Sequence, residues 1–115
     1  MERKSSWIRP LTMKYAPNDR FMITVTKSAE LSGIQLVDYK GSLYIGDVDE
    51  GPFYATAIDR GDKILSINGI KSEDIANVAH AENILLESKE KITLFLERPD
   101  PNEDPGCRYI MERIF

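Results

Sequence analysis

Cysteine and histidine are almost missing from this sequence, and each absence removes a class of chemistry. Cys107 is the only cysteine and His80 the only histidine in the chain. An internal disulfide and a cysteine-based metal site are therefore excluded. A Ser-His-Asp or Cys-His catalytic arrangement would have to use His80, and no nucleophile motif accompanies it. We expect no enzymatic activity, no metal and no cofactor.

Long apolar runs and an excess of basic residues are also lacking. The net charge is −4, which disfavours a general binder of nucleic acid or anionic membranes, because such a protein needs a basic patch. No apolar run approaches the length of a membrane span, and no apolar signal-peptide core follows the first seven residues. The length is enough for one small domain. We expect a cytoplasmic protein.

Short alternating apolar segments between turn signals predict a sheet of five or six strands. A short helical turn is expected at 53–57, and one longer helix at 78–88 with Asn77 as its N-cap. Asn68-Gly69 is a tight-turn signal. This order is typical of a small α+β domain, a mainly antiparallel β-sandwich or barrel with one short and one longer helix. The expected strands are 21–26, 33–37, 43–48, 63–67, 70–71 and 91–98.

Composition divides the chain into four parts. Residues 1–19 form an N-terminal extension, and residues 20–98 form the domain. Residues 99–107 contain three prolines and three acids, which predicts an acidic linker. Residues 108–115 form an apolar C-terminal tail.

A glycine stands where the second strand should begin. The stretch "KSAELSGIQL" leads through a short polar loop to Gly33, and an alternating Ile-Gln-Leu follows at once. Glycine weakens a strand interior, so in a strand pattern it often marks a close approach of backbone or ligand. By itself, however, Gly33 fits the end of a hairpin loop at least as well.

Four segments carry a recurring order and spacing: Leu31-Ser32-Gly33-Ile34, Asp49-Glu50-Gly51-Pro52, "RGDKILSINGI" from Arg60 to Ile70, and the capped helix followed by "KITLFLER". Over about residues 20–98 they resemble the PDZ domain family, with the first segment in the place of the carboxylate-binding Gly-Leu-Gly-Phe. The early position of the second strand resembles the animal strand order rather than the permuted order of bacterial proteases. Two residues depart from the family pattern, since Ser32 replaces a usually apolar residue and Phe53 a usually small one.

The resemblance implies a scaffold module that captures C-terminal tails of membrane or signalling proteins and is recruited to membranes through them. The tail would add as a strand beside the strand that begins at Gly33. Its carboxylate would bind the backbone N–H groups of Ser32, Gly33 and Ile34, next to Leu31, because converging N–H groups form an anion site. Lys27 matches a basic family position that assists the carboxylate. No direct binding of membranes or nucleic acid is expected.

The same resemblance implies an apolar pocket for the last ligand residue. Its expected lining is aliphatic: Ile34, Leu36 and Leu85, with Ile67 nearby.

The helix register then decides which residue faces the third-from-last ligand residue. If His80 were the first helical residue, the polar Asn83 would face the core. If Val78 is first, Ala81 and Leu85 face inward, so we choose Val78 and interpret His80 as solvated. Val78 has no hydrogen-bonding group, and a buried hydroxyl opposite it would cost about 1–3 kcal/mol. We therefore expect ligands of the form apolar-x-apolar-COOH.

Three alternatives stay open. Glu82, one turn after Val78, either selects a basic or hydroxyl-bearing residue upstream in the ligand or is only solvated. The tail 108–115 either packs on the domain, which we favour, or places Phe115 and its carboxylate in a groove. The module either captures other proteins or self-associates as a homodimer through its groove or extensions.

Overall fold

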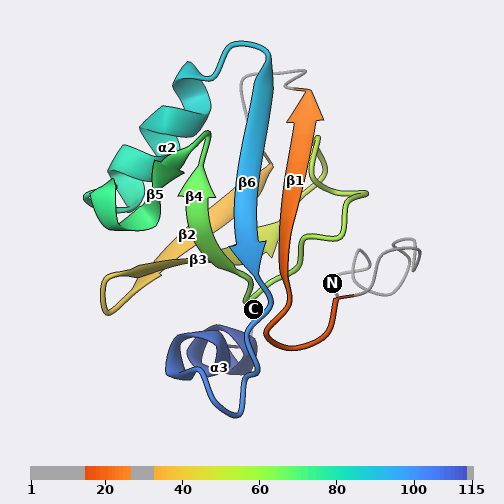
Figure 1. Ribbon diagram of the computed structural model, residues 1–115, viewed down its shortest axis with the longest axis vertical. Coiled ribbons are helices and arrows are strands. Elements are labelled where there is room, and N and C mark those ends of the chain that lie inside the picture. Colours follow the sequence, from red (N-terminus) through yellow and green to blue (C-terminus); the bar gives the residue numbers. More distant parts are fainter. Residues whose placement is uncertain (1–14, 27–32, 114–115) are drawn as a thin grey trace.

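The chain folds into one antiparallel sheet flanked by helices (Figure 1). The computed structural model describes residues 15–26 and 33–113. The strand order is β1-β6-β4-β3-β2, and β5 pairs with β4. This confirms the expected α+β, mainly antiparallel class, with six strands in one open sheet. The elements are β1 (Arg20–Thr26), β2 (Ile34–Tyr39), β3 (Ser42–Val48), β4 (Lys63–Ile67), β5 (Ile70–Lys71), the 3₁₀ helix η1 (Ser72–Asp74), α2 (Val78–Glu87), β6 (Lys91–Glu97) and α3 (Pro105–Glu112).

Strands β1 and β6 form because their apolar residues alternate. In β1, Phe21, Ile23 and Val25 are buried and the residues between them are exposed. Successive side chains of a strand point to opposite faces, so one face of β1 enters the core. The register pairs these residues with Leu96, Leu94 and Ile92 of β6, which are all fully buried.

Two hairpins are closed by two-residue turns. Lys40 and Gly41 between β2 and β3 have φ of 50° and 87°, and Asn68 and Gly69 between β4 and β5 have φ of 51° and 85°. Positive φ at both central residues defines the type I′ turn, which matches the twist of the strands that it joins. The structure thus places a turn at the Asn68-Gly69 signal.

One hydrophobic core lies between the sheet, helix α2 and the segment 53–58. Burying such aliphatic and aromatic side chains contributes about 1.5–3 kcal/mol each. Its members with no exposed surface are Ile45, Phe53, Ile58, Ile67, Ala81, Ile92, Leu94 and Leu96.

Segment 53–57 was predicted to be a short helical turn, and the structure shows successive turns with no helix assigned. The N–H of Thr56 donates to the carbonyl of Phe53 at 3.1 Å, and the Thr56 hydroxyl donates to the same carbonyl at 2.8 Å. A threonine side chain that bonds to the backbone competes with helix formation. The unusual Phe53 ring is fully buried, so this segment serves to fill the core.

Residues 99–107 were predicted to be a linker, and here the structure differs. The carboxylate of Asp100 accepts the N–H of Asn102 in an ordered turn, and helix α3 begins inside the predicted linker at Pro105. Asp104 is the N-cap and accepts the N–H of Cys107 at 2.9 Å. Proline is favoured at the first helical position because its missing N–H has no partner to lose there. Asp104 and Pro105, at the end of the predicted linker, therefore start a helix.

Helix α3 packs on the β2–β3 hairpin. Cys107 and Ile110 of α3 and Tyr44 of β3 form a second buried cluster, against which Tyr39 packs. The Tyr44 hydroxyl donates to the Asp104 carboxylate at 2.7 Å. This packing agrees with the favoured role of the tail as far as residue 113; Ile114 and Phe115 lie outside the described residues.

Candidate functional site

Gly33 has a backbone conformation and an environment that explain the glycine. Its φ is +81°, a region that residues with a Cβ rarely adopt. A Cβ at this position would lie 3.2 Å from the carbonyl oxygen of Glu50 and 3.3 Å from that of Asp49. The Gly33 carbonyl accepts the N–H of Asp49 at 2.7 Å. Gly33 thus lets the start of β2 lie directly against the loop that follows β3.

Strand β2 is at the edge of the sheet, and within the described ranges 15–26 and 33–113 it pairs only with β3. Because the turn at 40–41 has two residues, the backbone N–H and C=O of Tyr39 form hydrogen bonds with β3. Residues that bond to a given neighbour alternate along an antiparallel strand, so Val37 is the next residue of β2 that bonds to β3. The N–H and C=O groups of Leu36 and Asp38 therefore point away from β3. An edge of this kind can accept another strand.

Helix α2 packs against β2 and β4 and begins where the register argument placed it. Asn77 is the N-cap, and its side chain accepts the N–H of His80 at 2.8 Å. His80 in turn accepts the N–H of Ala76 through Nδ1 at 2.9 Å. These reciprocal bonds resemble a capping box. Val78 is the first helical residue, and His80 is an exposed capping residue.

The structure brings the five predicted apolar residues together. Leu36, Ile67 and Leu85 belong to the core cluster, and Ile34 and Val78 pack against it half-buried. Ile67 has no exposed surface, so it packs inside the core and cannot touch a ligand directly. β2 and α2 thus each contribute a half-buried aliphatic side chain, Ile34 and Val78, that packs against the same buried cluster.

The other predicted site residues do not belong to this apolar group. Glu82 is exposed on α2, one turn after Val78. Lys27, Leu31 and Ser32 lie outside the described residues, so their roles at the carboxylate stay predictions.

Asp49 belongs to the second PDZ-like segment of the sequence, and sequence reasoning missed its contacts with β2. The Gln35 side-chain amide donates to the Asp49 carboxylate at 3.1 Å, and Asp49 also binds the Gly33 carbonyl through its own N–H. Asp49 therefore joins the loop after β3 to the first residues of β2. No periodic or motif signal in the sequence marks a single acidic residue for this role. That Asp49 lies next to Gly33 is visible only in the folded structure.

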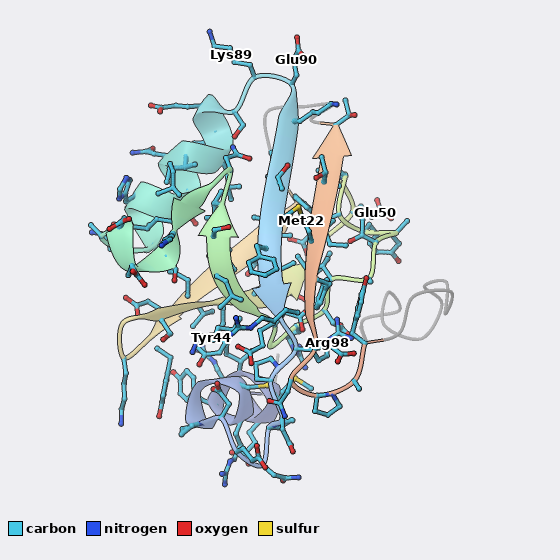
Figure 2. The ribbon with its side chains drawn as sticks, viewed as in Figure 1. Met22, Tyr44, Glu50, Lys89, Glu90 and Arg98 are labelled. Carbon is cyan, nitrogen blue, oxygen red and sulfur yellow. The ribbon has the colours of Figure 1, made fainter. Side chains whose placement is uncertain are left out.

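A buried ion pair joins Arg98 and Asp62 outside this region. Arg98 donates through Nε to Oδ1 of Asp62 at 2.7 Å and through Nη2 to Oδ2 at 3.0 Å. Burial raises the pKa of the Asp62 carboxyl to about 6, although the Arg98 bonds oppose that shift. Arg98 lies toward the α3 end of the molecule, away from α2 (Figure 2). The pair therefore connects the end of β6 to the 57–62 segment.

Two more shifted groups lie under α3. Burial and the bond to Asp104 raise the pKa of the Tyr44 hydroxyl, and burial raises the pKa of the Cys107 thiol to about 11. Both groups are thus neutral at physiological pH and serve packing. In the part of the chain that the structure describes, no group of acidic, histidine or cysteine side chains could hold a metal ion, and no helix is long and apolar enough to cross a membrane.

Comparison with known families agrees with this geometry. The family model of the PDZ domain matches residues 22–97. The chain belongs to the PDZ family. PDZ domains are interaction modules and generally not enzymes, and they bind peptides by adding them to a sheet edge. Helix α3 lies outside the matched residues.

A solved structure is similar to most of this chain. It is described as the PDZ domain from choanoflagellate GIPC bound to GAIP peptide. The TM-score is 0.65 and the sequence identity 20%, over 71% of this chain and 92% of that chain. The likeness supports the PDZ fold. Comparison with curated protein sequences gave no significant match.

Proposed function

We propose that this PDZ domain binds the C-terminal tail of partner proteins as an added strand on β2. The observation that carries the proposal is the open edge of β2 beside α2, with outward backbone groups at Leu36 and Asp38. An antiparallel tail would place its last residue near Ile34, where β2 begins. Its carboxylate would bind the backbone N–H groups of Ser32, Gly33 and Ile34, near Leu31, with Lys27 assisting.

The side chains beside that edge favour apolar ligands. Ile34, Leu36 and Leu85 surround the place of the last ligand side chain, and Ile67 supports them. Val78 is half-buried at the first helical position, so a ligand hydroxyl there would lose its water without gaining a partner. We therefore propose a preference for apolar-x-apolar-COOH tails. Glu82 stands one turn further along α2 and adds a preference for a basic or hydroxyl-bearing residue upstream.

The test is fluorescence polarisation with a library of C-terminal peptides, each paired with its terminal amide. We expect apolar-x-apolar tails to bind and the amides to bind far more weakly, since the amide removes the charge that the backbone N–H groups would hold. The variant Val78→His should shift selection toward Ser or Thr at the third-from-last position. Equal binding of acid and amide would contradict the carboxylate site.

The partners that fit this chemistry are membrane or signalling proteins with free apolar C-termini, met in the cytoplasm. The alternative is self-association, through the groove or the extensions. Light scattering over a range of concentrations separates the two, because capture of foreign tails requires no change of mass with concentration. Removal of residues 108–115 tests occupancy of a groove by the chain's own end; a rise in peptide affinity would support it.

A further inference from the structure

The side chain of Asn68 joins the sheet to helix α2. Asn68 lies in the turn between β4 and β5, and its Oδ1 accepts the N–H of Thr93 in β6 at 2.8 Å. Its Nδ2 donates to Oγ of Ser88 at 2.7 Å. The Ser88 hydroxyl donates in turn to the carbonyl of Ile84 at 2.8 Å. The Thr93 amide can only donate, so the oxygen of the Asn68 side chain faces β6 and its nitrogen faces the helix.

This bridge reaches the end of α2 that carries the terminal pocket. Ser88 is the C-cap of α2, and Ile84 and Leu85 belong to its last turn. Leu85 is only 4% exposed and packs in the cluster with Leu36 of β2. The position of this last turn therefore sets the space between Leu85 and β2.

The hydrogen bonds at the other end of α2 are different in kind. The Asn77 side chain accepts the N–H of His80, and the His80 side chain accepts the N–H of Ala76, so both hydrogen bonds stay within residues 76–80. They stabilise the first turn but do not connect it to a strand. The Asn68 bridge, by contrast, ties the helix to β6 and to the β4–β5 turn.

We propose that Asn68 and Ser88 are positioning residues for the last ligand side chain. They hold the last turn of α2 at a fixed separation from β2 and so limit which terminal side chains fit. Both act through Leu85. The inference rests on the proposed function, because it concerns the terminal pocket of that same site.

Asn68→Gly and Ser88→Ala remove the bridge from either side. Glycine tolerates the φ of 51° at position 68, so the turn keeps its shape. Asn18→Gly is the matched control, because Asn18 also has a positive φ, 74°, and is exposed, but it lies before β1. Each protein is titrated with two free-carboxylate peptides that differ only in a terminal Val or Phe.

We expect Asn68→Gly and Ser88→Ala each to weaken binding of the preferred peptide by about two- to tenfold, the range of one hydrogen bond. The ratio of the two Kd values should move toward one. The double variant should resemble the single variants, because both substitutions break the same bridge. Asn18→Gly should keep both the affinity and the ratio. Amide exchange of residues 85–88 should accelerate without any peptide.

A purely structural role predicts another result. General destabilisation weakens binding of both peptides by the same factor, so the Kd ratio would stay at its wild-type value and the proposal would be overturned. If the wild-type protein binds neither free-carboxylate peptide, the proposed function itself fails and the positioning role fails with it. These two failures are distinct, since the first occurs only in a protein that binds.

Discussion

Replacing Gly33 by alanine tests whether this glycine is needed for its φ alone or also for its close approach to the loop after β3. Gly33, Gly41 and Gly69 have nearly the same φ, at 81°, 87° and 85°. A Cβ at Gly41 or Gly69 would meet nothing within 4 Å, whereas at Gly33 it would meet three backbone atoms at 3.2–3.3 Å. The three alanine variants therefore share the strain of positive φ and differ in crowding.

The shared cost is about 1–2 kcal/mol, since left-handed backbone brings a Cβ close to the following carbonyl oxygen. Gly33→Ala carries a further cost of about 1 kcal/mol or more, because overpacking forces the surrounding backbone to move. That backbone includes Asp49, whose N–H bonds to the Gly33 carbonyl. We thus expect Gly33→Ala to lower the free energy of unfolding by about 2–3 kcal/mol.

Urea denaturation gives the free energy of unfolding of each variant, and peptide titration gives its affinity. Gly33→Ala should lose both stability and affinity, because the displaced residue directly precedes the strand that would hold the ligand. Gly41→Ala and Gly69→Ala should lose stability only. Equal loss of stability in all three variants would refute the argument from crowding. Unchanged affinity in Gly33→Ala would refute the link between this backbone and binding.

Three further predictions concern the rest of the fold. Gly106→Ala should lower the melting temperature, although alanine favours helices by about 1 kcal/mol, because its Cβ would overlap the Tyr44 hydroxyl; a higher melting temperature would contradict the packing of α3. Phe53→Ala should cost about 3–5 kcal/mol in urea denaturation, since the ring is fully buried, and a loss below 1 kcal/mol would sink this reasoning. The pKa of Asp62 is raised from 3.8 to about 6, so the folded state binds this proton more tightly than the unfolded state. Relative to Asp62→Asn, the wild type should therefore lose on the order of 3 kcal/mol of stability between pH 4 and pH 6, and a pH-independent difference between the two proteins would disprove it.

Much of the fold was predictable because its signals are local. The period-two alternation in 21–26 and 91–98 predicted two strands that the structure places side by side as β1 and β6. Asn77 predicted the start of α2, because an asparagine side chain can satisfy a free N–H of the first turn. Elements with this local chemistry were found within two residues of their predicted bounds.

The errors arose where local signals were ambiguous. Proline and acidic residues in 99–107 are typical of linkers but also of helix starts, and only the buried contacts of Cys107 and Ile110 with Tyr44 favour the helix. In segment 53–57, the burial of Phe53 and the side-chain bonds of Thr56 outweighed the helical pattern.

The candidate site, like the fold, was predictable from the sequence only in part. The sequence by itself determined the PDZ-like order of strands, the identity of the apolar side chains and the helix register that puts Val78 first. Only the tertiary structure decided that Ile67 is a buried support, that Asp49 joins Gly33, and that Asn68 bridges to Ser88. The physical reason is sequence separation. Periodicity and capping act between residues a few positions apart. The Asp49–Gly33 and Asn68–Ser88 hydrogen bonds join residues 16 and 20 positions apart, which meet only when the sheet and the helix have packed.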